Sequence, residues 1–144
     1  RKQDPNGAYA AVIPKFVSQF MAGESPVING NGEFSRDFTY IDNVIQANLL
    51  SMITDNKEAI NTVYNVAFGE RNTLKDLVEL LKKQLTEFDS KIKDIQVIYG
   101  PNRVGDIPHS LASIDKAKNL LAYNPQFSLE KGLKEAVNWY WNNL

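Results

Sequence analysis

The sequence predicts an α/β fold with about five helices and a few short strands. Three observations lead to this prediction. Apolar residues recur at helical spacing in five stretches, short runs rich in branched and aromatic residues lie between them, and Gly or Pro marks the joins. The strands are too few and too short for a complete doubly wound domain, so we expect the chain to pack against a further domain.

The N-terminal part predicts one helix and one short strand after a turn at residues 4–7. Apolar residues recur at helical spacing over residues 12–21. Pro14 belongs in the first turn of this helix, because proline is tolerated only there, and Gly23 is a good C-terminal cap. A short strand is expected at residues 27–28.

Residues 30–43 combine a glycine turn, an extended segment and a helix start. The aromatic residues between positions 35 and 40 suit a pleated, half-buried segment in which Arg36 and Phe38 share one face. A guanidinium beside an aromatic ring suits an anion attached to a flat ring system, since its planar fork of donors matches phosphate oxygens. The alternative is a surface strand that carries an ordinary Arg–Asp pair.

The middle of the chain continues the alternation of helices and strands. Asp42 is expected to cap the second helix. Residues 62–66 are expected to form a buried strand, and residues 95–99 another. Between them, Thr73 and Asp76 form a capping box that opens an amphipathic helix.

Two further helices end the chain. Ser113 and Ser128 are expected to cap them. Tyr140, with a tryptophan on either side, is expected to seal the last helix against the core rather than to bind a ligand ring.

Composition excludes several classes of function. The 144 residues fit one domain, with 43% hydrophobic and 23% charged residues and a net charge of −1. The sequence has no basic stripe of the kind that would predict nucleic-acid binding, and none of its apolar stretches is long enough to cross a membrane. The absence of cysteine and the single histidine, His109, leave no cysteine or histidine-rich metal site. We expect a cytoplasmic protein without metal, nucleic-acid or membrane partners.

The sequence offers binding groups but no set of catalytic residues. It has no glycine-rich dinucleotide fingerprint and no Tyr-x-x-x-Lys, because none of the six tyrosines has a lysine four positions later. Arg103 and Asp106, on either side of Gly105, can offer a phosphate-binding fork and a hydroxyl acceptor. A solvated Arg–Asp pair is the alternative, and His109 fits an ordinary loop histidine.

Five short motifs occur in order along nearly the whole chain. They are Asp4-Pro5-Asn6-Gly7-Ala8-Tyr9 before Val12-Ile13-Pro14-Lys15-Phe16, Gly30-Asn31-Gly32 before Arg36-Asp37-Phe38, Tyr40-Ile41-Asp42-Asn43-Val44, Tyr64-Asn65-Val66-Ala67 before Thr73-Leu74, and Arg103-x-Gly105-Asp106 with Glu130-x-Gly132-Leu133. Together they resemble the C-terminal half of extended short-chain dehydrogenase/reductase (SDR) enzymes that act on nucleotide sugars. The opening residues 1–9 look most like UDP-N-acetylglucosamine 4-epimerases of bacterial surface-polysaccharide pathways.

The resemblance implies that residues 1–144 are the nucleotide-sugar-binding C-terminal portion of a longer enzyme. An upstream Rossmann domain would hold NAD and the Tyr-x-x-x-Lys pair, and the chain opens without an initiator methionine. The implied reaction is oxidation and re-reduction at C4 of a UDP-sugar, in a homodimer. A UDP-glucuronate epimerase, a nucleotide-sugar dehydratase and a non-catalytic nucleotide-sugar-binding module are the alternatives, which the residues before Arg1 would separate.

The resemblance also implies roles for individual residues. Ser110 stands four residues after the loop aspartate, where epimerases confined to plain hexoses have a bulky tyrosine, so it leaves room for a C2 acetamido group. The other implied contacts are with the nucleotide and the sugar. Arg36 and Arg103 would bind the diphosphate, Asp106 the ribose hydroxyls and Phe38 the nucleotide ring. The uracil pocket would be lined by Val12, Val27 and Asn29, and Gln3 would lie near the sugar or its acetamido group.

Overall fold

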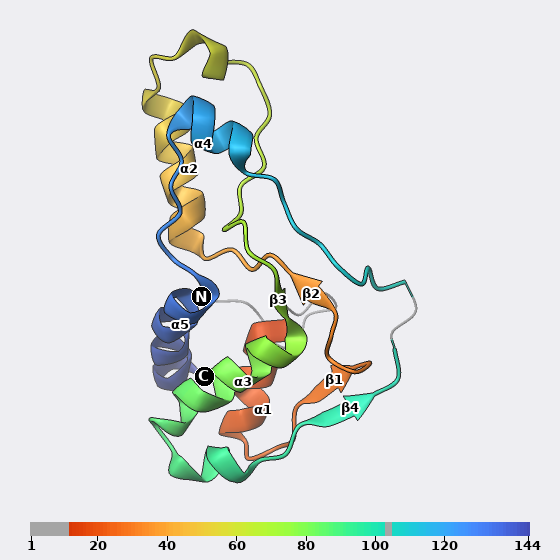
Figure 1. Cartoon of the computed structure of the whole chain (residues 1–144). Coiled ribbons are helices and arrows are strands. Elements are labelled where there is room, and N and C mark those ends of the chain that lie inside the picture. The colour runs from red at the N-terminus through yellow and green to blue at the C-terminus, as the bar shows by residue number, and fades with distance from the viewer. Residues whose placement is uncertain (1–11, 103–104) are drawn as a thin grey trace. The chain divides into compact units, whose positions relative to one another are not determined.

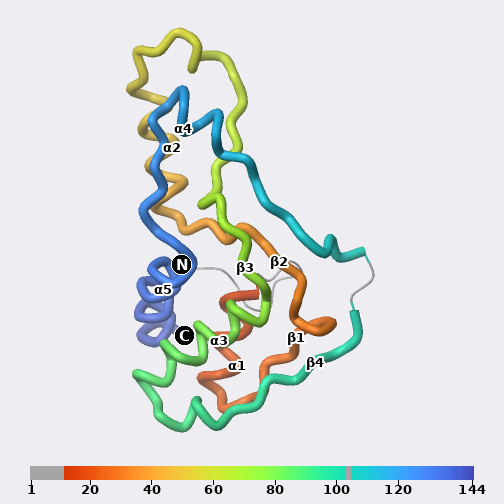
Figure 2. The backbone as a smooth tube through the Cα atoms, viewed as in Figure 1, coloured from red at the N-terminus to blue at the C-terminus, as the bar shows by residue number. Residues whose placement is uncertain are grey.

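The computed structural model describes residues 12–102 and 105–144 (Figure 1). Within them it has five α-helices and four short strands, which confirms the predicted α/β class. The chain divides into two compact units. The first takes the chain up to Phe34, residues 73–108 and residues 133–144, whereas the second takes residues 35–72 and 109–132, as can be followed along the tube in Figure 2.

The first unit combines helices with one parallel strand pair. Helices α1 and α3 contact each other, and η2 packs against α3. Strands β1 and β4 pair in parallel, with Val27 opposite Ile98 and Asn29 opposite Gly100. Its elements are α1 (Val12–Met21), β1 (Val27–Asn29), α3 (Leu74–Thr86), the 3-10 helix η2 (Ser90–Asp94), β4 (Ile98–Gly100) and the greater part of α5 (Leu129–Asn143).

Local capping signals in the first unit are confirmed. After α1, Gly23 has a φ of 72°, its N–H donates to the Phe20 carbonyl, and the Glu24 N–H donates to the Gln19 carbonyl. This is the Schellman pattern that glycine favours. At the start of α3, the Thr73 hydroxyl accepts from the Asp76 N–H, while the Asp76 carboxylate accepts from the Thr73 N–H.

The second unit has a small core made largely of alanines. Helix α2 contacts α4, and the α2 residue Ala47 is buried in this core. The core residues are Ala47, Ala67, Ile114, Ala117 and Tyr123. The elements of the unit are β2 (Ser35–Arg36), α2 (Ile41–Ile53), the 3-10 helix η1 (Lys57–Ala59) and α4 (Asp115–Leu121). The remaining strand, β3 (Asn72–Thr73), pairs with β2.

Two predicted caps are wrong. Helix α2 begins at Ile41, so Tyr40 occupies the N-cap position and provides no side-chain hydrogen bond. Asp42 lies inside the first turn instead, where a carboxylate still interacts favourably with the helix dipole. Before α4 the N-cap is Ile114, and Ser113 donates its hydroxyl to the Asp115 carboxylate.

Three strand predictions need correction. Residues 62–66 form no strand in the described part of the chain, because no other strand lies beside them. Strand β4 covers residues 98–100 rather than 95–99, and β2 covers only the first two residues of the segment 35–40. Residues 36–40 are nevertheless half-buried, as expected.

The C-terminal helix agrees with its sequence pattern. The Lys131 N–H lies 3.4 Å from the Ser128 hydroxyl, as expected for a serine that caps α5. Tyr140 is buried, which raises the pKa of its hydroxyl, and the Trp141 ring stacks on Phe88 at 5.2 Å. Among the described residues, no helix combines the length and the apolar character needed to cross a membrane.

Candidate functional site

Two of the predicted site residues meet at the backbone carbonyl of Ser35. The Arg36 guanidinium donates to this carbonyl through Nη1 at 2.8 Å, and the Ser110 N–H donates to it at 3.1 Å. Strand β2 therefore places Arg36 beside the loop that carries Ser110. This proximity between residues far apart in the sequence could not be read from either motif alone.

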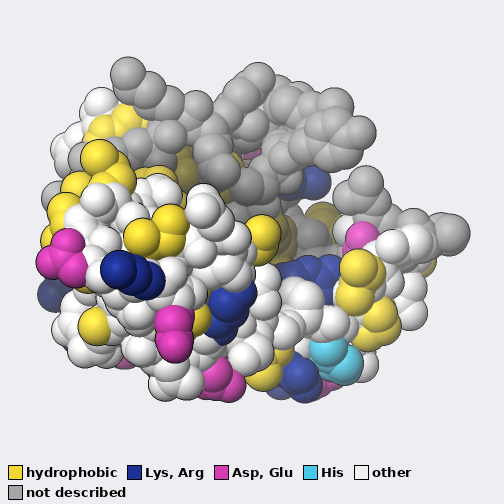
Figure 3. Space-filling model, turned by 90° about the horizontal axis from the view of Figure 1, so that it is seen from above, with side chains coloured by type: hydrophobic (Ala, Val, Ile, Leu, Met, Phe, Trp, Pro, Cys, Tyr) yellow, Lys and Arg dark blue, Asp and Glu magenta, His cyan; other side chains and the backbone are white. Residues whose placement is uncertain are grey.

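The Ser35 side chain also holds residues 35–36 against residues 109–110, a contact that we call the junction at Ser35. Its hydroxyl lies 2.8 Å from Nδ1 of His109, and the backbones of these two residues form a parallel bridge. Ser35 is 1% exposed, so its hydroxyl needs a partner inside the protein. His109 is thus more than the ordinary loop histidine that the sequence suggested. It is the single histidine of the chain, and its side chain is the cyan one in Figure 3.

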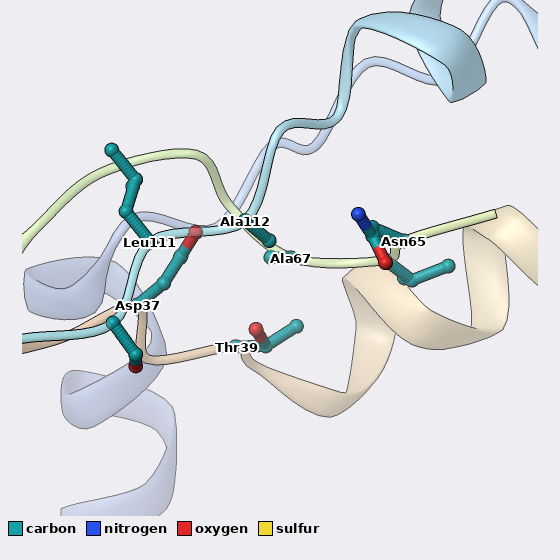
Figure 4. Close-up of a pocket in the computed structure, with 8 residues that line it drawn as sticks. Asp37, Thr39, Asn65, Ala67, Leu111 and Ala112 are labelled. Carbon is teal, nitrogen blue, oxygen red and sulfur yellow. The ribbon is translucent and has the colours of Figure 1, made fainter. Parts of the chain in front are cut away.

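An open pocket of about 430 Å³ lies in the second unit between three extended segments (Figure 4). Ser110 is one of its lining residues, as are Asp37 and Thr39, whereas Arg36 and Phe38 are not. Lining and non-lining residues therefore alternate along residues 36–39, as expected for an extended segment in which Arg36 and Phe38 share one face. The complete lining is Asp37, Thr39, Asn65, Val66, Ala67, Ser110, Leu111 and Ala112.

Asp37 holds one wall of the pocket in place. Its carboxylate accepts hydrogen bonds from the Phe68 N–H at 3.2 Å and from the Gly69 N–H at 3.0 Å. Next to this turn, the buried Tyr123 hydroxyl donates to the Ala67 carbonyl at 2.8 Å. Burial, and to a lesser extent the negative charge of Asp37, raise the pKa of Tyr123, so this hydroxyl stays a donor.

Asn43, at the start of α2, is a buried polar residue that holds a distant segment of the chain in place. It is 1% exposed, its amide donates to the Phe127 carbonyl, and its oxygen accepts from the Gln126 and Phe127 N–H groups. The Tyr40 ring packs on Phe127 at 5.0 Å. These bonds fix the chain that leads into α5, and they explain why a polar side chain at this position tolerates full burial.

The remaining predicted site residues that the structure describes belong to the first unit. Val12 opens α1 and is partly buried, Val27 and Asn29 lie on β1 and are exposed, and Asp106 is partly buried in the loop after β4. Directly after β1, Gly30 has a φ of 75°, a backbone conformation that favours glycine. Gln3 and Arg103 lie outside the described residues.

Sequence reasoning missed part of the pocket. Asp37, Thr39 and Asn65 line it, although the sequence analysis predicts a binding role for none of them. Asn65 lies in the Tyr64-Asn65-Val66-Ala67 motif, so the motif itself was the signal for a lining segment. In the described chain, no group of three or more His, Asp or Glu side chains could hold a metal ion.

The fold is that of extended SDR enzymes over part of their length. The chain belongs to the GDP-mannose 4,6 dehydratase family, whose pattern it matches over residues 3–136. This family groups extended SDR enzymes that modify nucleotide sugars.

Individual relatives are nucleotide-sugar epimerases. A UDP-N-acetylglucosamine 4-epimerase from Methanobrevibacter ruminantium, solved with UDP-N-acetylmuramic acid, is 42% identical to this chain, with a TM-score of 0.85. The match covers 99% of this chain and 43% of the epimerase chain. A putative UDP-glucose 4-epimerase of Methanocaldococcus jannaschii is 31% identical over 99% of this chain and 42% of its own length. A Bacillus cereus UDP-glucuronic acid 4-epimerase, solved with UDP-glucuronic acid and NAD, is 28% identical to this chain, with a TM-score of 0.78. The match covers 98% of this chain and 41% of the epimerase chain.

The chain therefore spans well under half the length of these relatives. NAD is the cofactor of the family. The glycine-rich turn typical of an NAD site and the Tyr-x-x-x-Lys pair are both absent from this sequence.

Proposed function

We propose that this chain is the nucleotide-sugar-binding portion of an NAD-dependent UDP-sugar 4-epimerase that interconverts UDP-N-acetylglucosamine and UDP-N-acetylgalactosamine. The cofactor and the catalytic tyrosine belong to a domain that precedes this chain in the complete protein. NAD supplies the oxidation and re-reduction at C4. The chain described here keeps the nucleotide in place while the sugar reacts.

The observation that carries this proposal is the shared carbonyl of Ser35. It holds Arg36, the proposed ligand of the diphosphate, beside the backbone of Ser110, the proposed neighbour of the C2 substituent. Charge-assisted bonds from a guanidinium to phosphate are strong and directional, which suits a nucleotide that must not move. Similarity to the UDP-N-acetylglucosamine 4-epimerase, at 42% identity, supports the same substrate class.

The other proposed ligands keep the roles implied by the motifs. Asp106 accepts from the ribose hydroxyls, and Phe38 lies against the nucleotide. Arg103 is a second diphosphate ligand, and Gln3 contacts the sugar. Val12, Val27 and Asn29 line the uracil site, where the exposure of Val27 and Asn29 leaves them accessible to a ligand.

A second candidate is a UDP-glucuronate 4-epimerase. The observation in its favour is a Thermodesulfobacterium geofontis enzyme of this activity, which is 32% identical over 97% of this chain. The two candidates differ in the sugar: one carries an acetamido group at C2 and the other a carboxylate at C6. They share the nucleotide ligands, so only the sugar contacts separate them.

The test is an epimerisation assay on the complete protein with UDP-N-acetylglucosamine, UDP-glucose and UDP-glucuronic acid in parallel. The proposal predicts formation of UDP-N-acetylgalactosamine with the largest kcat/KM of the three. Preferred turnover of UDP-glucuronic acid would support the second candidate instead. Residues 1–144 alone should be inactive, because they lack the groups that transfer hydride and proton, and turnover by this fragment would contradict the proposal.

A further inference from the structure

The buried hydroxyl of Ser35 has one partner among the described residues, the ring of His109. Ser35 Oγ and His109 Nδ1 lie 2.8 Å apart, and Ser35 is buried whereas His109 is exposed. A buried hydroxyl hydrogen needs an acceptor, and Nδ1 can accept it only if the ring hydrogen sits on Nε2. Ser35 therefore donates to Nδ1, and this bond selects both the tautomer and the orientation of the ring.

The carbonyl of Ser35 uses both of its acceptor positions at the same place. One position is taken by Nη1 of Arg36 at 2.8 Å, and the other by the N–H of Ser110 at 3.1 Å. Because a carbonyl oxygen has two lone pairs, a turn of this peptide group would weaken both bonds together. The direction of the Ser35 carbonyl thus decides where the Arg36 guanidinium lies.

The side chain of His109 opposes such a turn. Strand β2 has only two residues, so its backbone pairing alone resists a turn weakly. The ring adds a side-chain bond to Ser35, beside the parallel bridge between the two backbones. His109 is also the chain neighbour of Ser110, so the same residue keeps the second donor of the Ser35 carbonyl in place.

We infer that His109 is a positioning residue of the nucleotide-sugar site. It acts through Ser35, whose carbonyl it holds in the direction that places the Arg36 guanidinium and the Ser110 backbone. His109 thus contributes to ligand binding through Ser35, not through a ligand contact of its own. The inference rests on the proposed function in taking Arg36 as the ligand of the diphosphate.

Three substitutions of His109 isolate the bond at Nδ1. His109→Ala removes it, whereas His109→Asn keeps an acceptor as many bonds from Cβ as Nδ1 is. His109→Gln carries the same amide one bond further from Cβ, so it does not replace Nδ1. In calorimetric titration of the complete protein with UDP, Kd should rise roughly tenfold in the Ala and Gln variants, the scale of one hydrogen bond. The Asn variant should bind UDP within about twofold of the wild type.

A general loss of stability would not produce this pattern. Asn56→Ala removes the side-chain cap of η1 in the same unit, so it loses stability without touching the junction at Ser35 and should bind UDP like the wild type. In a protein that already carries Arg36→Ala, His109→Ala should leave the remaining UDP affinity nearly unchanged, because its effect passes through Arg36. Unchanged UDP affinity in folded His109→Ala, or equal losses with and without Arg36, would overturn the inference. If His109→Ala fails to fold, the comparison of the Asn and Gln variants still decides.

A second measurement needs no ligand and separates this inference from the proposed function. In NMR spectra of the arginine-labelled complete protein, the guanidinium hydrogens of Arg36 should exchange with water roughly tenfold faster in His109→Ala than in the wild type or His109→Asn. Their signal is identified by its loss in Arg36→Ala. Unchanged exchange in His109→Ala would overturn the positioning role and leave the function standing. Faster exchange in a protein that binds no UDP would contradict the function and leave the positioning of Arg36 standing.

Discussion

The hydroxyl of Ser35 lies 2.8 Å from Nδ1 of His109, across 74 residues of sequence. The two residues belong to the two chain segments that build the second unit. Because the Ser35 carbonyl also accepts from Arg36 and from the Ser110 N–H, one buried serine organises both segments around the proposed ligand groups.

Removing either partner of this bond should therefore destabilise the junction. Ser35→Ala and His109→Ala should each lower the free energy of unfolding by about 0.5–1.5 kcal/mol, the net value of a hydrogen bond. Because they remove the same contact, the double variant should lose less than the two single losses added together. Urea denaturation of the complete protein measures this, with Ser90→Ala, at an exposed position, as a control. Strictly additive losses would show that the bond contributes nothing.

Asp37 should matter for folding more than for ligand affinity. Asp37→Asn keeps the shape of the side chain but removes the charge that two backbone N–H groups share, so we expect a loss of about 1.5–3 kcal/mol of stability. The amides of Phe68 and Gly69 should exchange faster in this variant. UDP affinity should change less than twofold, and Asp55→Asn, at an exposed position, serves as the control. A large loss of affinity at unchanged stability would make Asp37 a ligand-binding residue.

The capping box of α3 predicts a pH dependence. Hydrogen bonds from the Thr73 hydroxyl and N–H hold the pKa of Asp76 below its ordinary value. The stabilisation is therefore complete above the carboxyl's ordinary pKa, near 4, and is lost as the pH falls through the lower folded-state pKa. Thr73→Ala should cost about 1 kcal/mol at pH 7, and this difference should shrink below pH 4. Thermal unfolding of both proteins from pH 7 to pH 3 measures it, and a constant difference would contradict the assignment.

Ser110 tests the choice of sugar. If it faces the C2 substituent, Ser110→Tyr adds a ring where the acetamido group should lie. In the complete enzyme we expect kcat/KM for UDP-N-acetylglucosamine to fall at least tenfold, about 1.4 kcal/mol of transition-state binding. Activity on UDP-glucose should fall much less, and since unfolding would lower both, the ratio carries the test. An unchanged ratio would remove Ser110 from the sugar site.

Local patterns predicted the caps at Gly23, Thr73 and Ser128 but misplaced those at Asp42 and Ser113. The Gly23 cap and the capping box at Thr73 were correct because the bonds involved span only a few residues. The predicted strand at residues 62–66 was wrong for a physical reason, since a strand exists only with a neighbour, and none lies in the described chain. The segment is also not buried as predicted, because Val63 is 85% exposed.

The candidate site was predictable residue by residue but not as an arrangement. Family motifs pointed to Arg36 and Ser110, whereas nothing in either motif indicated that both would bond to the Ser35 carbonyl. The same holds for Asp37, whose carboxylate caps a turn about thirty residues away. Contacts of this range depend on the whole packing of the second unit, which no spacing pattern encodes.

We expect Arg36 to hold the diphosphate of a UDP-sugar, and calorimetric titration of the complete protein with UDP measures this contact. Arg36→Ala should weaken binding by about 2–3 kcal/mol, roughly 30- to 150-fold in Kd. Arg36→Lys should recover only part of this loss, because an ammonium cannot reproduce the planar fork. Lys118→Ala removes a positive charge from exposed α4 and should bind UDP like the wild type. Unchanged UDP affinity in a folded Arg36→Ala protein would contradict the account.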